Sequence, residues 1–334
     1  MVFKRLLGSL GVGGPTVDTV LAPGAVLPGG TLSGRVHLEG GNADFDIDRI
    51  TLELVARVEA EHDSGESEGV VVFDRFTIGG GFRLAAGEQH GVPFSLTLPW
   101  ETPITELHGQ GLGIALGVRT ELAVAGAKDK GDLDPLAVRP LPVQEAVLEA
   151  LGQLGFGFKS ADLEYGRIRD TGQQLPFYQE IELTPAPQYA HRVNEIEVTF
   201  LAAPGGMDVV LEADKRGGFF SAGHDALTRH TVSHDGVAHQ DWNAVVDGWI
   251  QQLVEHRTAH GGHGSYGHGE PYVGHGHGDH HGDHHGGHRS GPGMGTAIAA
   301  GAAGLAVGVV GGMVAAEVVD EVGDFFEGDE EDEG

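Results

Sequence analysis

The chain has 334 residues, no cysteine and a formal net charge of −29, with 20 Lys and Arg against 49 Asp and Glu. This length exceeds what one ordinary core supports, so two domains are expected. The lack of cysteine excludes disulfides and thiolate chemistry and agrees with a cytoplasmic protein. The acidic charge argues against nucleic acid as a partner, because no basic stripe offsets it.

The first residues, Met1–Val12, combine two basic residues with a short apolar run that glycines interrupt. A secretory signal is not predicted, because the run is short and lacks a small-residue cleavage site. An amphipathic helix docked on its own domain is favoured over a helix that touches a membrane surface.

Alternating apolar and polar residues predict a β-sheet domain in the first part of the chain. Leu32, Val36 and Leu38 share one face of the stretch Leu27–Gly41, and Pro-Gly and Gly-Gly pairs bound this strand. Together with the preceding run, Val17–Leu27, it is expected to form the first two strands of a β-sandwich. Further strands are predicted at Ile50–Val58, Val70–Ile78, Val92–Leu98 and Leu112–Val124. Their spacing, with almost no helical periodicity, indicates an antiparallel sandwich.

A charged stretch that ends in proline, Lys128–Pro135, is read as the linker between the two domains. Strand-like residues at Leu136–Val138 and a first helix that starts at Pro142 follow it. The apolar face of this helix consists of Val143, Val147, Leu151 and Leu154. Strands are then expected at Leu175–Leu183, Ile196–Ala202 and Met207–Ala213.

A last helix is predicted from about Asp241, and the folded part is expected to end near Arg257. Its apolar stripe consists of Trp242, Val246, Trp249 and Leu253.

The pattern of these elements resembles the bacterial sporulation-control protein family of the SpoOM type. The motifs that carry the resemblance are a basic N-terminus, Val17-Asp18, Pro28-Gly29, Gly34-Arg-Val36, Gly40-Gly41, the charged linker, Leu141-Pro142, Phe156–Gly166 and Trp242…Trp249. The match covers about residues 1–258, and its motifs are structural rather than catalytic. It implies an arrestin-like fold of two β-sandwich domains, and a regulator of sporulation or cell development that acts by protein contact.

The search for catalytic motifs yields only weak candidates. Gly109–Gly113 resembles a nucleotide-binding loop but precedes a strand, so a turn is predicted. Asp44, Asp46 and Asp48 alternate like the start of a calcium loop, but Arg49 stands where the loop needs glycine. A solvated edge is the favoured interpretation.

Histidines next to carboxylates are the remaining candidates for chemistry. They are His224-Asp225, His230, His234-Asp235 and His239. Imidazole beside carboxylate suits a metal site or a general base, and a hydrolase using His224, His234 and Asp235 is one reading. Surface histidines in a polar loop are favoured, because no nucleophile accompanies them. No enzyme is predicted.

The segment from His256 to His288 contains eleven of the 20 histidines, interleaved with glycine. So much glycine supports neither a core nor a stable helix, so disorder is expected. The candidate ligands for Zn²⁺, Ni²⁺ or Cu²⁺ are His275, His277, His280, His281, His284, His285 and His288. Such binding is expected to be multisite and to weaken below about pH 6.5, where imidazole protonates. The alternative is a polar spacer.

Gly295–Ala316 carries no charge, and as a helix of 22 residues it would reach about 33 Å. Gly304, Gly308 and Gly312 then share one face, the spacing that lets helices approach closely in lipid. Membrane association or self-association, and a loosely ordered tail, stay open as alternatives. The chain ends in an acidic run that is typical of a solubilising terminus.

The sequence thus predicts an all-β protein of two arrestin-like antiparallel β-sandwich domains with one or two short helices and a disordered C-terminal tail. The predicted parts are a first sandwich (1–130), a second sandwich with helices (131–258), a His/Gly-rich segment (259–293), a Gly/Ala-rich apolar segment (294–322) and an acidic terminus (323–334). The expected function is a non-enzymatic, cytoplasmic scaffold for protein partners. The alternative is a metal-binding or metal-responsive protein that uses the His-rich tail and is tethered to a membrane.

Overall fold

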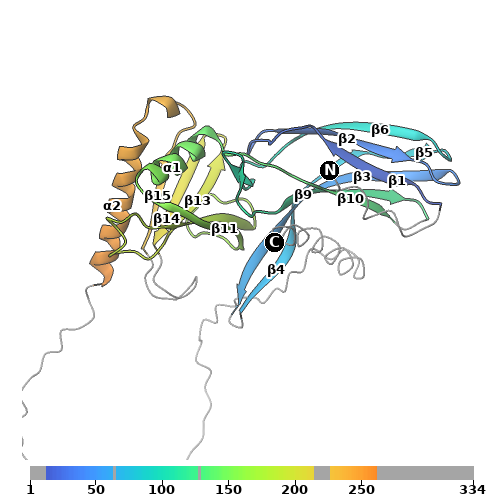
Figure 1. The fold of residues 1–334 in the computed structure, drawn as a ribbon. Helices are drawn as coiled ribbons and strands as arrows, with labels where there is room; N and C mark the ends of the chain where they lie inside the picture. The colour runs from blue at the N-terminus through green and yellow to red at the C-terminus, as the bar shows by residue number, and fades with distance from the viewer. Residues whose placement is uncertain (1–12, 63–64, 127–128, 214–225, 262–334) are drawn as a thin grey trace, which may run out of the picture.

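The computed structural model describes residues 13–62, 65–126, 129–213 and 226–261. These residues form two β-rich halves that lie end to end, the N-terminal half with β1 to β10 and the C-terminal half with β11 to β15 (Figure 1). Two α-helices and one short 3₁₀-helix accompany the strands in the described residues, so the predicted all-β class is confirmed.

Two larger sheets and one two-stranded sheet build the N-terminal half in the described residues. Strands β1, β2 and β6 form a three-stranded sheet, and β10, β9 and β3 belong to a ten-stranded sheet that continues into the other half. The strands of the N-terminal half are β1 (Thr16–Leu21), β2 (Thr31–Glu39), β3 (Phe45–His62), β4 (Gly65–Gly79), β5 (Phe82–Leu84), β6 (Gln89–Thr97), β7 (Glu106–Leu107), β8 (Gln110–Gly111), β9 (Leu116–Val124) and β10 (Lys130–Pro135).

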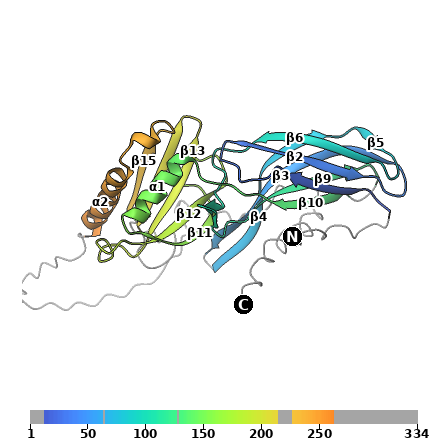
Figure 2. The ribbon, with the colours of Figure 1, turned by 45° about the horizontal axis from the view of Figure 1, so that its top comes forward.

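Strand β3 is the element that both halves share. Its 18 residues extend for about 60 Å at about 3.3 Å per residue. Its first part pairs with β9, β4 pairs with most of its length, and Glu59 near its end pairs in parallel with Glu164 of β11. Figure 2 shows β3 and β4 running from the N-terminal half toward β11. The halves are therefore joined by a continuous hydrogen-bonded sheet.

The apolar residues that alternate along β2 are buried, as predicted. Leu32, Val36 and Leu38 are buried between the two sheets, where they pack in one large core. Gly34 stands in phase with them, directly opposite Phe94 of β6 in the register. A Cβ at this position would lie 2.5 Å from the Phe94 ring, so glycine is needed to let the ring cover the strand.

In the described residues, the C-terminal half consists of five strands of the ten-stranded sheet, two α-helices and one 3₁₀-helix. Its strands are β11 (Gly157–Tyr165), β12 (Phe177–Thr184), β13 (Ile196–Ala203), β14 (Gly206–Ala213) and β15 (Ala226–Val232). The helices are α1 (Pro142–Gln153), the 3₁₀-helix η1 (Val237–His239) and α2 (Trp242–Gly261). Both α-helices cover the same face of the sheet (Figures 1 and 2). The second layer of the sandwich expected for this half is thus helical in the described residues.

Local sequence explains both helices. Pro142 suits the first turn of α1, and the Leu141 backbone N–H donates to Gln144 Oε1 at 2.8 Å. Val147 and Leu151 of the predicted stripe are fully buried. In α2, Val246 and Leu253 are buried as predicted. No helix in the described residues is long and apolar enough to span a membrane.

Several boundary predictions are wrong, among them the end of the folded part near Arg257, because helix α2 continues to Gly261. The supposed linker Lys128–Pro135 contains strand β10, which pairs with β9 over its whole length, so the predicted division at residues 130/131 falls inside a strand. In Leu136–Val138, only Val138 forms an isolated bridge. The strand expected over Leu112–Val124 begins at Leu116, because Gly113 adopts a φ of +82° that breaks the extended chain.

Candidate interaction surface and the junction between the halves

The loop after β6 clamps the N-terminal half to the C-terminal half. The Glu101 carboxylate accepts hydrogen bonds from the backbone N–H groups of Gln174, at 2.8 and 2.9 Å, and of Leu175, at 2.8 Å. The Gln179 side chain accepts from the Ile104 N–H and donates to the Ile104 carbonyl, each at 2.9 Å. These side chains fix one half against the other, because each satisfies main-chain groups across the junction.

Aromatic contacts complete the junction. Trp100 stacks on His234 with ring centroids 5.2 Å apart, and Phe73 meets Phe177 edge to face at 5.6 Å. Gly29, with a φ of +68°, leaves room for Trp100, because a Cβ there would lie 2.5 Å from the indole. The paired strands, polar clamp and aromatic contacts together predict that the halves move as one body.

Strand β15 ends the ten-stranded sheet. In the described residues it pairs with β14 on one side, and its other edge has no strand partner. Leu227 near its start is 47% exposed, so its apolar side chain is accessible to a partner. An unpaired edge offers main-chain N–H and C=O groups to another strand. This edge is the best candidate interaction surface in the described part of the chain.

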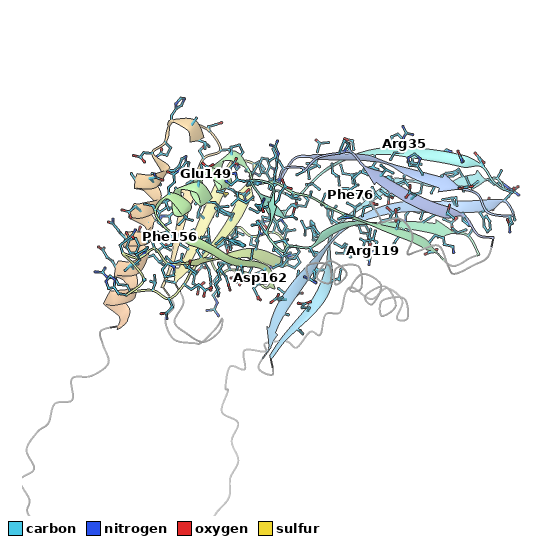
Figure 3. All side chains as sticks on the ribbon, in the orientation of Figure 1. Arg35, Phe76, Arg119, Glu149, Phe156 and Asp162 are labelled. Atoms are coloured by element: carbon cyan, nitrogen blue, oxygen red, sulfur yellow. The ribbon has the colours of Figure 1, made fainter. Side chains whose placement is uncertain are left out.

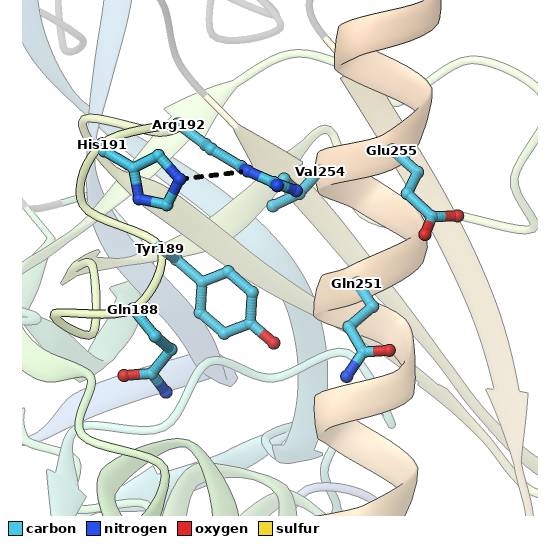
Figure 4. A pocket seen from close by; sticks show the side chains of 7 residues that line it. All are labelled: Gln188, Tyr189, His191, Arg192, Gln251, Val254 and Glu255. Carbon is cyan, nitrogen blue, oxygen red and sulfur yellow. Dashed lines mark hydrogen bonds between the residues drawn. The ribbon is translucent and has the colours of Figure 1, made fainter.

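A pocket lies between the turn after β12 and helix α2 (Figure 4). The residues that line it are Gln188, Tyr189, His191, Arg192, Gln251, Val254 and Glu255. The Tyr189 hydroxyl donates to Asp247 Oδ1 at 2.7 Å, and Arg192 Nε donates to His191 Nε2 at 3.2 Å. Burial and, secondarily, Asp247 raise the pKa of Tyr189. The lining offers hydrogen bonds but no serine, threonine or cysteine nucleophile.

Of the histidines proposed as a site, the three that the structure describes have separate contacts. His230 stacks on Trp249 of α2 with centroids 4.6 Å apart, and burial lowers its pKa. His234 lies at the junction, 2.7 Å from the Ala203 carbonyl through Nε2. His239 is exposed in η1, and His224-Asp225 lies outside the described residues. The hydrolase arrangement therefore has no geometric support among the described residues.

The other weak motifs largely behave as predicted. Gly109–Gly113 forms a tight turn with β7 and β8, with a φ of +76° at Gly109. Asp44 is exposed, and its pKa is lowered, first by the Ala86 backbone N–H and then by Arg83. Asp46 and Asp48 are also exposed. The exposure predicted for these carboxylates is confirmed, but Asp46 and Asp48 lie inside β3, which begins at Phe45 and pairs there with β5, and not on an edge ahead of the strand.

The predicted histidine ligands in the tail, His275 to His288, lie outside the described residues. So do the N-terminal segment 1–12, the apolar segment Gly295–Ala316 and the acidic terminus 323–334. The expectations for all of these segments stay predictions.

Buried charge is the feature that sequence reasoning missed. Glu53 of β3 is fully buried between two arginines, with Arg75 Nε at 2.5 Å and Arg119 Nε at 2.7 Å (Figure 3 labels Arg119). Asp132 and Asp134 of β10 lie against β1, where the Thr19 backbone N–H donates to Asp132 Oδ2 at 2.6 Å. Burial, followed by Asp132 and Asp18, raises the pKa of Asp134 to about 7.

Among the described residues, three groups of side chains have the donor composition of a metal site. They are His108 with Glu145 and Glu149, Asp162 with Glu164 and Glu180, and Glu182 with Glu195 and Glu197. A sequence signal existed for the second and third groups, because pairs of acids spaced by two residues share one face of a strand. That spacing does not show which strands lie next to each other in the sheet.

Comparison with known proteins identifies the family. The model of a family described as SpoOM protein matches residues 3–217. Sporulation-control protein spo0M of Bacillus subtilis (strain 168) is 37% identical over 215 residues, which are 64% of this chain and 81% of that protein. The crystal structure of Spo0M, sporulation control protein, from Bacillus subtilis matches with a TM-score of 0.65 and 32% identity, over 72% of this chain and 100% of that chain. The chain belongs to the SpoOM protein family.

Proposed function

We propose that this protein is a cytoplasmic regulator in the control of sporulation that acts by binding partner proteins rather than by catalysis. Its similarity to the Bacillus subtilis sporulation-control protein supports the regulatory role. The single structural observation that supports the mechanism is β15, whose outer edge has no strand partner among the described residues. A partner strand could pair with this edge and extend the sheet.

The strands at two other sheet ends, β6 and β10, are less suited than β15 to strand addition. Strand β6, at the end of the three-stranded sheet, contains Pro93, which cannot donate a ladder hydrogen bond. Strand β10, at the far end of the large sheet, packs against β1. In contrast, β15 has the sequence ALTRHTV, without proline and with β-branched residues. Strand addition is therefore favoured at β15.

The net charge of the protein and the exposed Leu227 side chain indicate which kind of partner strand fits this edge. The formal net charge of −29 would attract a basic segment and repel an acidic one. Each main-chain hydrogen bond across the edge would contribute about 0.5–1.5 kcal/mol, and an apolar side chain on the partner could cover Leu227. A basic strand with one apolar anchor fits both features.

The regulatory role is tested by expressing the full chain in Bacillus subtilis that lacks its own spo0M and counting heat-resistant spores. Restoration of spore number to the level of the parent supports the proposal, and a count equal to that of the empty vector contradicts it. The edge is tested separately, with a photo-crosslinking residue in place of Leu227. Val20 is the matched control, because it is 50% exposed on a strand of the other sheet. Crosslinks of equal yield from both positions would contradict binding at β15.

A second candidate function is metal binding by the tail, which the density of eleven histidines between residues 256 and 288 favours. Calorimetry with Zn²⁺ or Ni²⁺ on the full chain and on a chain that ends at Gly261, the last residue of α2, measures this directly. Binding by the full chain alone supports tail ligation. A shortened chain that stays folded but loses biological activity would make metal handling the main function.

A further inference from the structure

Carboxylates gather on the face of the C-terminal sheet that lies opposite the helices. Asp162 and Glu164 alternate along β11, and Glu180 of β12 is the direct register partner of Asp162. One oxygen of each of the three carboxylates lies within 4.8 Å of the others. Figure 3 shows Asp162 where β11 approaches the β3–β4 hairpin.

Two of these three carboxyl groups are buried, and the more buried of the two is Glu180. Glu180 is 3% exposed and Glu164 is 8% exposed. Glu180 Oε2 is buried and accepts no hydrogen bond within the part of the chain that the structure describes. A buried carboxylate oxygen of this kind carries a desolvation penalty unless a proton or a cation compensates it.

The surroundings of Glu180 disfavour the negative charge of its ionised form, so a bound cation would have to replace its proton. Burial raises the pKa of Glu180 to about 11, and the nearby charges that add to this effect are four carboxyls: Glu197, Asp162, Glu164 and Glu212. The adjoining trio of Glu182, Glu195 and Glu197 differs, because Lys159 Nζ lies 2.9 Å from Glu182 and 2.8 Å from Glu195. Lys159 therefore offsets part of the negative charge of the Glu182 group. In the adjoining group, Glu180 is the most buried carboxyl.

We propose that Asp162, Glu164 and Glu180 bind a divalent cation of the hard, oxygen-seeking class, with Ca²⁺ as the preferred ion. Two carboxylate oxygens that share one Ca²⁺ at about 2.3–2.6 Å are up to about 5 Å apart, and the 4.8 Å limit of this group fits that span. All donors are oxygens, which suit Ca²⁺, Mg²⁺ and Mn²⁺ rather than Zn²⁺ or Cu²⁺. Asp162 is partly exposed and provides the entry path.

Such an ion would act on the junction between the halves. Glu164 is the residue of β11 that pairs with Glu59 at the end of β3, so the site adjoins the strand that both halves share. An ion held by β11 and β12 would stiffen this connection and stabilise the folded protein by mass action. Binding of Ca²⁺ would therefore raise the melting temperature.

The test uses the full chain, freed of metal with a chelator and titrated with Ca²⁺, Mg²⁺ or Mn²⁺ by calorimetry and by thermal melting. At Ca²⁺ 100 times above Kd, the melting temperature is expected to rise by about 5 °C. Glu180→Gln keeps the size of the side chain and is expected to weaken Ca²⁺ binding at least tenfold. Asp162→Asn, at the more exposed rim, gives a second variant in case Glu180→Gln fails to fold.

The matched control is Glu149→Gln, in the exposed group with His108 and Glu145 (Figure 3 labels Glu149). It is expected to bind Ca²⁺ like the unchanged protein, and the acidic terminus is the same in all variants. Tighter binding of Mn²⁺ or Mg²⁺ than of Ca²⁺ would overturn the choice of ion. The site itself is refuted if the unchanged protein shows no binding below 10 mM Ca²⁺, or if Glu180→Gln and Asp162→Asn bind Ca²⁺ as it does.

Discussion

The carboxyl group of Asp134 predicts how stability changes with pH. Burial first, and then the charges of Asp132 and Asp18, raise the pKa of Asp134 from 3.8 to about 7 in the folded protein. Between these pH values the folded protein keeps a proton that the unfolded chain has released. The favourable contribution is therefore fully present below about pH 4 and is lost as pH rises toward 7.

The magnitude follows from the size of this difference. A rise from 3.8 to about 7 corresponds to about 4 kcal/mol for a fully buried group. Asp134 is partly exposed, so screening by water reduces this to about 2 kcal/mol. Asp134→Asn resembles the protonated acid in shape and cannot ionise. We expect it to raise the free energy of unfolding by about 2 kcal/mol at pH 8 and to change it little at pH 4.

Urea unfolding between pH 4 and pH 8.5, followed by far-UV circular dichroism, measures this prediction through the unfolding midpoint. Asp46→Asn is the matched control, because Asp46 is exposed on β3, and its profile should follow that of the unchanged protein. If Asp134→Asn loses as much stability between pH 4 and pH 8 as the unchanged protein does, the buried carboxyl pair is not the source of the pH dependence.

Three further predictions concern other parts of the molecule. Arg119→Ala leaves buried Glu53 with one arginine and should lower the free energy of unfolding by about 3 kcal/mol. An unchanged midpoint of urea unfolding would contradict a stabilising Arg119–Glu53 pair. Gly34→Val should lower the free energy of unfolding by about 2 kcal/mol, because the new side chain clashes with the Phe94 ring. A melting temperature equal to or above that of the unchanged protein would refute this clash. Deletion of Gly295–Ala316 should shift protein from the membrane to the soluble fraction if that segment associates with lipid, and an unchanged distribution in cell fractionation excludes this association.

Much of the fold was predictable because the order of apolar and polar residues along one strand or helix shows which of its faces is buried. The alternation of Leu32, Val36 and Leu38 identifies one face of β2, and the spacing of Val147 and Leu151 identifies the inner face of α1. Strand β10 escaped prediction because its acids resemble a linker. Their burial depends on β1, which is more than a hundred residues away in the chain.

The candidate sites were less predictable for the same physical reason. Glu180 meets Asp162 only through the pairing of β12 with β11, and Glu164 meets β3 only through a long-range parallel contact. Spacing along the chain places two acids on one face of a strand, but it does not say which strand lies beside them. The edge of β15 likewise becomes visible only when the order of the strands is known.

The central claim is that the edge of β15 holds the partner through which sporulation is controlled. Its most direct test compares Leu227→Lys with Val20→Lys in Bacillus subtilis that lacks its own spo0M, with heat-resistant spores counted and protein levels matched. A lysine on an open edge disfavours the addition of another strand. We predict that Leu227→Lys lowers the spore count to that of the empty vector, whereas Val20→Lys restores it as the unchanged chain does. Equal restoration by both variants would contradict the proposed role of β15.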